Sequence, residues 1–102
     1  MNSNITKAIK LEQAKNNAEL KALMGKKPLK SWIDTTESLA VISSSPNNNK
    51  NNTLYNKACA NVGLAFGIRA LSVPSTFRQF VKLYKHSLYL NAMLEADKQF
   101  KL

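Results

Sequence analysis

The chain has 102 residues, a formal net charge of +9, and hydrophobic residues at 44% of its positions. That hydrophobic share is too high for a wholly disordered chain and too low for a multi-span membrane protein. One cysteine excludes a disulfide framework and a zinc site built from cysteines. The length allows one modest hydrophobic core, so we expect a single small unit over residues 1–102.

The positive charge is concentrated in the middle of the chain. No Asp or Glu occurs between Glu37 and Glu95, whereas six cations lie in that interval: Lys50, Lys57, Arg69, Arg78, Lys82 and Lys85. Such a charge distribution favours an anionic partner, which can be a nucleic acid, acidic lipid headgroups or an acidic protein surface. The alternative interpretation is a basic domain whose charge serves only its solubility.

Residues 4–24 are predicted to form the first helix, because strong helix formers dominate the segment and Gly25 and Pro28 follow it. Its apolar residues fall into two narrow stripes on opposite sides of the helix. One stripe contains Ile5, Ile9, Leu20 and Leu23, and the other contains Ala8, Leu11, Ala14, Ala18 and Ala22. Two stripes suggest contacts on both sides, including one with a partner. The alternative is that the alanines reflect helix propensity alone.

The second predicted helix covers residues 32–43. Ser31-Trp32-Ile33-Asp34 resembles a capping box at its start, and its buried residues are predicted to be Trp32, Ile33, Leu39 and Ile42. Residues 43–53 are rich in asparagine and serine and contain no side chain that would anchor them. We therefore predict a flexible connector there.

Residues 54–71 are predicted to form a third helix that is dense in small residues. Gly63 and Gly67 have the Gly-x-x-x-Gly spacing, which places both glycines on one helix face and allows another backbone to approach closely. We expect a helix buried in protein or at an interface. The alternative is one irregular membrane span that reaches residue 77, although that window contains Arg69 and Pro74.

A long fourth helix is predicted over residues 74–99, with Pro74 in its first turn. One face is broadly apolar and contains Phe77, Phe80, Val81, Leu83, Tyr84, Leu88, Leu90 and Leu94. A separate polar stripe, spaced by four, three and four residues, contains Arg78, Lys82, Lys85 and Tyr89. Stacked cations without an acid repel one another, so this stripe favours an anionic partner.

The sequence offers few groups for catalysis. His86 is the only candidate acid–base group near neutral pH, and no Asp, Glu or Cys lies within one helical turn of it. No phosphate-binding glycine loop, nucleophile elbow or paired-cysteine motif occurs. We expect no enzymatic activity, no cofactor and no metal site.

Two short segments resemble known families. Residues 71–77 are similar to the turn of a helix-turn-helix, without its glycine. Leu83-Tyr84-Lys85-His86-Ser87-Leu88 resembles the Leu-Tyr-Arg/Lys-x-x-Leu element of the LYR-motif family, which are small, basic, helical mitochondrial proteins that include accessory subunits of respiratory complex I. That resemblance implies motif roles for Leu83, Tyr84, Lys85 and Leu88.

Together these observations predict an all-α protein of three to four helices, loosely packed or extended, with an asparagine-rich connector. The expected function is that of a non-catalytic accessory subunit in a larger, membrane-associated assembly, with a mitochondrial respiratory complex at the inner membrane as the candidate that the resemblance implies. The alternative is a small nucleic-acid-binding protein, as in a ribonucleoprotein or a phage-type regulator. The expected partners are protein subunits or anionic lipid headgroups, and the predicted partner-binding residues are Gly63, Gly67, Arg78, Lys82, Leu83, Tyr84, Lys85, Leu88 and Tyr89.

Overall fold

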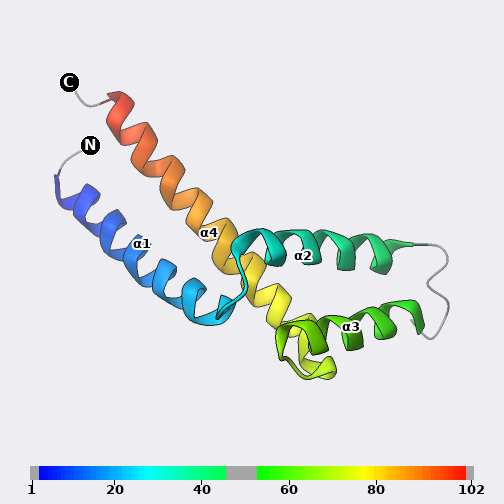
Figure 1. The fold of residues 1–102 in the computed structure, drawn as a ribbon. Coiled ribbons are helices and arrows are strands. Elements are labelled where there is room, and N and C mark those ends of the chain that lie inside the picture. Colours follow the sequence, from blue (N-terminus) through cyan, green and yellow to red (C-terminus); the bar gives the residue numbers. More distant parts are fainter. Residues whose placement is uncertain (1–2, 46–52, 101–102) are drawn as a thin grey trace. The chain divides into compact units, whose positions relative to one another are not determined.

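The computed structural model describes residues 3–45 and 53–100, and within these residues the chain is helical and contains no strand. The helices are α1 (Ser3–Met24), α2 (Leu29–Ser44), α3 (Thr53–Phe66) and α4 (Val73–Phe100), with a short 3₁₀ helix, η1 (Ala70–Ser72), before α4. Figure 1 shows their order along the chain. The predicted all-α class with three to four helices is confirmed.

The chain, expected to form one unit, divides into two compact units. The first contains Met1–Gly25 and Phe80–Leu102, and we call it the α1–α4 pair. In it, α1 and the later part of α4 run antiparallel and side by side (Figure 1). The second contains Lys26–Gln79, and we call it the aromatic unit. It holds α2, α3, η1 and the beginning of α4.

Three aromatic rings form the core of the aromatic unit. Trp32 of α2 is almost fully buried, and its ring centroid lies 4.9 Å from that of Phe66 and 4.7 Å from that of Phe77. Phe66 and Phe77 meet edge to face at 5.4 Å. Each ring comes from a different helix, so the cluster joins α2, α3 and the start of α4. Aromatic contacts of this kind add stabilisation beyond the area that they bury.

The predicted start of α2 was wrong by three residues. The helix begins at Leu29, after Pro28, and no side-chain hydrogen bond caps it. Ser31 therefore lies inside the first turn, where its backbone N–H donates to the Pro28 carbonyl at 3.0 Å. The fixed φ of proline suits a helix entry, so Pro28 replaces the expected capping box. Trp32 and Leu39 are buried as predicted, whereas Ile33 and Ile42 are half-buried.

The predicted end of the third helix was also wrong, because α3 ends at Phe66 and not at residue 71. Gly67 has a φ of +69°, a left-handed conformation that favours glycine, and the Ile68 N–H donates to the Gly63 carbonyl at 2.8 Å. This bond across the end of the helix is the signature of a Schellman C-cap. Gly67 thus terminates α3, so the two glycines do not share a helix face.

The other predicted bounds agree closely with the structure. α1 spans Ser3–Met24, and α4 spans Val73–Phe100. Part of the predicted connector, residues 46–52, lies outside the described residues. Its two ends are helical, since α2 continues to Ser44 and α3 begins at Thr53.

Gly63→Ala should destabilise the aromatic unit. A Cβ at this position would overlap the Ile68 carbonyl oxygen and would lie 3.3 Å from the Ala70 nitrogen. Backbone atoms cannot move aside as a flexible side chain can, so we expect a loss of about 2 kcal/mol in the free energy of unfolding. Urea denaturation followed by the fluorescence of Trp32, the only tryptophan, measures it. Ala65→Ser, at an exposed position of the same helix, is the control and should change stability by less than about 0.5 kcal/mol. Equal effects of the two changes would contradict the close contact at Gly63.

Candidate functional site

The inward faces of the α1–α4 pair follow a regular spacing of three and four residues. The positions on α1 are Thr6, Ile9, Gln13, Asn16, Leu20 and Leu23, and those on α4 are Phe80, Leu83, Ser87, Leu90, Leu94 and Asp97, all of them buried or half-buried. We call these two rows the seam. Their spacing is that of the contact positions in a coiled coil, so the two helices meet along one stripe of each.

Polar side chains occupy nearly half of the seam and bond across it. Thr6 Oγ1 donates to Asp97 Oδ2 at 2.8 Å, and Asn16 Nδ2 donates to the Leu83 carbonyl oxygen at 2.9 Å. Gln13 also donates to the Asn91 side chain. Buried polar groups of this type fix the register of a helix pair at some cost in stability, because a shifted register leaves them without partners.

An ionisable pair also crosses between the helices. His86 Nε2 lies 3.4 Å from Glu12 Oε1, and the His86 and Tyr89 rings are 6.4 Å apart. No acid was expected near His86 within one turn of its own helix, but sequence reasoning missed Glu12, which comes from α1. In the described residues, no three His, Cys, Asp or Glu side chains gather as metal ligands would.

The side of α4 opposite the seam faces away from α1. Four side chains on that side, Lys82, Lys85, Leu88 and Tyr89, form what we call the outer α4 face. Leu88 is 50% exposed and Tyr89 is 61% exposed, and both lysines are exposed. All four belong to the predicted partner-binding set. The first acid that follows them on α4 is Glu95, so the face itself is basic and apolar.

Three other predicted partner-binding residues do not lie on the outer α4 face. Leu83 is buried in the seam, and Gly63 is buried against its own chain, with Ile68 and Ala70 occupying the space that a partner helix was expected to fill. Gly67 lies in a turn. Leu83 is buried because it is one of the contact positions of the seam. Gly67 lies in a turn because it ends α3.

The remaining two predicted residues lie elsewhere on α4. Tyr84 is half-buried, and its ring stacks on that of Phe80 at 5.7 Å. Arg78 is exposed in the aromatic unit. There, burial and the nearby Cys59 thiol raise the pKa of the Tyr55 phenol, and the positive charge of Arg78 acts in the opposite direction.

The two stripes predicted on α1 have different environments. Ile9 and Leu20 of the first stripe are buried in the seam. All residues of the second stripe are exposed, namely Ala8, Leu11, Ala14, Ala18 and Ala22. Leu11 lines a shallow hollow with Lys7 and Lys10. The α1–α4 pair therefore presents apolar side chains beside lysines on the outer sides of both helices.

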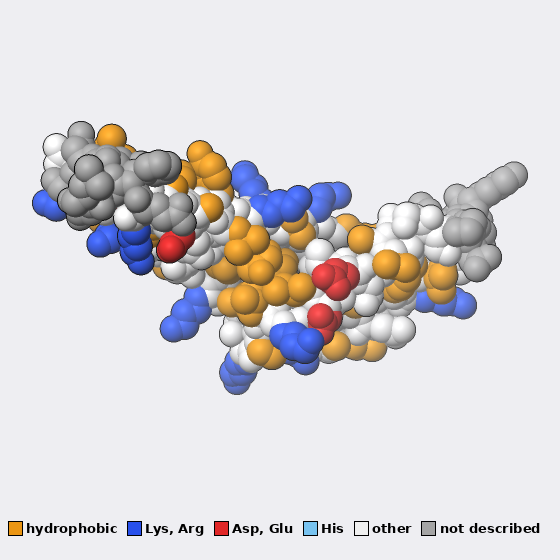
Figure 2. All heavy atoms as spheres, turned by 90° about the horizontal axis from the view of Figure 1, so that it is seen from above, with side chains coloured by type: hydrophobic (Ala, Val, Ile, Leu, Met, Phe, Trp, Pro, Cys, Tyr) orange, Lys and Arg blue, Asp and Glu red, His pale blue; other side chains and the backbone are white. Residues whose placement is uncertain are grey.

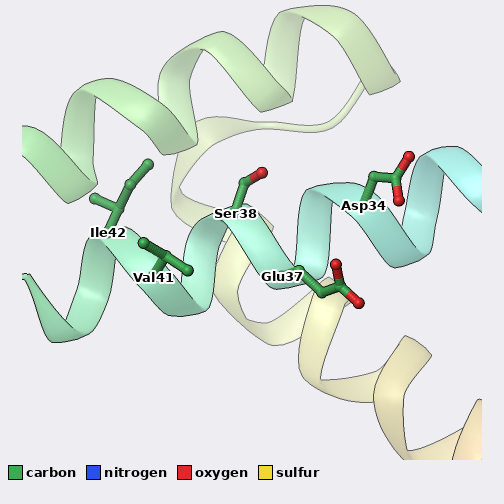
Figure 3. A pocket seen from close by; sticks show the side chains of 5 residues that line it. All are labelled: Asp34, Glu37, Ser38, Val41 and Ile42. Carbon is green, nitrogen blue, oxygen red and sulfur yellow. The ribbon is translucent and has the colours of Figure 1, made fainter.

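The aromatic unit carries a small acidic surface on α2. Figure 3 shows a shallow hollow lined by residues of this one helix: Asp34, Glu37, Ser38, Val41 and Ile42. Asp34 Oδ2 lies 3.4 Å from the Lys30 ammonium, in an exposed ion pair that contributes little stability. On the side shown in Figure 2, lysine and arginine side chains project at many places while acidic ones occupy few.

Comparisons of the chain with models of protein families, with curated proteins and with solved structures give no match. Among the described helices, none is both long enough and apolar enough to cross a membrane.

Asn16→Ala should loosen the α1–α4 pair. The substitution removes the bond from Asn16 Nδ2 to the Leu83 carbonyl, and a lost buried hydrogen bond costs about 1–2 kcal/mol. We expect amide hydrogen exchange in the middle of α1 to become roughly tenfold faster. Asn17→Ala is a matched control because the neighbouring asparagine is exposed, so exchange should stay within about twofold. Equal acceleration by both changes would contradict the seam.

Proposed function

We propose that the chain is a non-catalytic accessory subunit of a larger assembly at a membrane, and that the outer α4 face binds an acidic surface of a protein partner. One observation carries this proposal. Lys82 and Lys85 are exposed next to Leu88 and Tyr89 on a helix face that contains no acid.

The composition of this face suits a protein interface. Exposed aromatic and aliphatic side chains supply the apolar contact area at the centre of an interface, and tyrosine is among the residues that contribute most to binding. The two lysines have no ion-pair partner in their own helix face, so a partner's carboxylates would complement them. Complementary charge of this kind directs association and excludes basic or neutral surfaces.

The narrow seam also supports a role in an assembly. Among the described residues of the α1–α4 pair, the buried apolar side chains are Ile9, Leu20, Phe80, Leu83 and Leu90. A helix derives most of its stability from the apolar face that it buries against other elements. With one stripe of each helix in the seam and apolar residues left outside, a partner's helices would add burial that the pair lacks.

The type of assembly rests on a narrower observation. The resemblance of residues 83–88 to the LYR-motif family supports a mitochondrial respiratory complex. Of the residues in that element, Lys85 and Leu88 lie on the outer α4 face, whereas Leu83 lies in the seam. Partner contacts through the element would therefore involve Lys85 and Leu88, with Leu83 holding α4 in place.

The double charge reversal Lys82→Glu/Lys85→Glu should release the chain from its assembly. In extract from native cells, the tagged wild-type chain should sediment as a particle much larger than 11.4 kDa. The variant should dissociate, because the loss of two complementary charges weakens binding by roughly a hundredfold. The matched control Lys26→Glu/Lys30→Glu changes the net charge equally in the aromatic unit and should stay in the particle. A wild-type chain that sediments as a monomer, or a variant that behaves like the control, would reject the proposal.

A second candidate function, nucleic-acid binding, is favoured by one observation: the exposed Tyr89 ring lies on the same face as two exposed lysines. Such a combination can contact phosphates and stack on a base. Titration of labelled duplex DNA and single-stranded RNA at two salt concentrations tests it. Phosphate contacts predict a steep loss of affinity with salt and a further loss in Tyr89→Ala, whereas no binding at low salt would eliminate this candidate.

A further inference from the structure

The most exposed large apolar side chains of the described chain lie close together in sequence. Leu64, near the end of α3, is 85% exposed, and Leu71, in η1, is 95% exposed. α3 and η1 pack against each other within the aromatic unit. We call residues 63–72 the α3–η1 corner. Scattered apolar residues are normal on a protein surface, so two leucines this exposed on adjoining elements become informative through the charges that accompany them.

The backbone holds this corner in one conformation. Gly67 turns the chain in a left-handed conformation, and the Ile68 N–H bonds to the Gly63 carbonyl at 2.8 Å. Gly63 is in close contact with the Ile68 carbonyl and with Ala70, so the segment after α3 lies directly on the helix. Phe66, at the end of α3, is held by Trp32 and Phe77. Leu64 and Leu71 therefore lie on two elements that pack directly against each other.

Cations accompany these leucines. Arg69 is exposed between them in the sequence, and the Lys27 ammonium lies 5.3 Å from the centre of the Phe66 ring. The acids of the aromatic unit, Asp34 and Glu37, are both on α2, and the corner itself contains none. Exposed leucines flanked by cations are the combination that enters the interface of an anionic bilayer, where the apolar groups reach the acyl boundary and the cations meet the headgroup phosphates.

We propose that the α3–η1 corner inserts Leu64 and Leu71 into the surface of an anionic membrane, with Arg69 and Lys27 on the lipid phosphates. Charge complementarity selects this partner, because a zwitterionic bilayer has no net negative surface charge to attract the cations. The inference deepens the proposed function, on whose membrane association it rests, by naming the surface and the class of lipid. The residues of this membrane contact are different from those of the outer α4 face, which the proposed function assigns to an acidic protein partner.

Cosedimentation with vesicles tests the inference. The wild-type chain should bind vesicles of phosphatidylcholine mixed with phosphatidylserine, and should bind phosphatidylcholine alone at least tenfold more weakly (about 1.4 kcal/mol). Leu64→Ser/Leu71→Ser should bind the anionic vesicles about tenfold more weakly than the wild type. Val41→Ser is the matched control, because Val41 is 68% exposed but lies beside Asp34 and Glu37, and its binding should be unchanged. Unchanged Trp32 emission checks that each variant is folded.

A second measurement does not depend on removing the leucines. In Leu71→Trp, bromine-labelled anionic lipids should quench the new tryptophan, whereas in Val41→Trp they should not. Equal quenching at the two positions would overturn the inference, and so would equal vesicle binding by Leu64→Ser/Leu71→Ser and Val41→Ser.

Lys82→Glu/Lys85→Glu separates the inference from the proposed function. This variant should lose the protein partner, and its Leu71→Trp derivative should still be quenched. Quenching at position 71 without any assembly would reject the accessory-subunit proposal alone, and the reverse result would reject membrane insertion alone.

Discussion

The hydrogen bond from Asn16 to the Leu83 carbonyl determines how the α1–α4 pair is arranged. The bond is buried, and any shift of one helix along the other would leave the amide without its acceptor. The bond between Thr6 and Asp97 fixes the same register near the beginning of α1 and the end of α4. Because the register and rotation of α4 are set in this way, Lys82 and Lys85 point away from α1. The basic character of the outer surface is therefore a consequence of polar contacts inside.

The aromatic unit reaches a defined surface by a different route. Its three rings come from three helices and fix the end of α3, and the turn at Gly67 then places η1 against Gly63. Glycine serves here for close packing within one chain, although the same spacing is common where two separate helices meet. The surface that results carries leucines and cations, so both units expose apolar groups beside positive charge.

Much of the fold could be predicted from local patterns, and the errors arise where one pattern fits two structures or where a contact joins distant residues. The bounds of α1 and α4 follow from helix-forming residues and from Gly25 and Pro74, which act through the backbone of their own segment. The end of α3 could not be read in the same way, because a glycine at position 67 is compatible with a packed helix face and with a left-handed cap. The positive φ of Gly67 and the bond from the Ile68 N–H to the Gly63 carbonyl distinguish the two. The pairing of Glu12 with His86 joins residues far apart in the sequence, so no local pattern reveals it. The six seam positions of α1 do follow a spacing of three and four residues. Three of them are polar, however, so the spacing is not visible as a stripe of apolar residues.

The helices of the α1–α4 pair are separated in the sequence by the whole of the aromatic unit. During translation, α1 leaves the ribosome long before α4 has been made, and the intervening segment can fold first because its contacts are shorter in range. During that interval α1 has no helix to pack against. On a polysome, the α4 segment of a neighbouring nascent chain has the same sequence and can pack on α1 equally well. Exchange of α1 between two copies would keep every contact of the seam, so this topology permits domain swapping, and the rate of elongation through residues 26–79 sets how long the opportunity lasts.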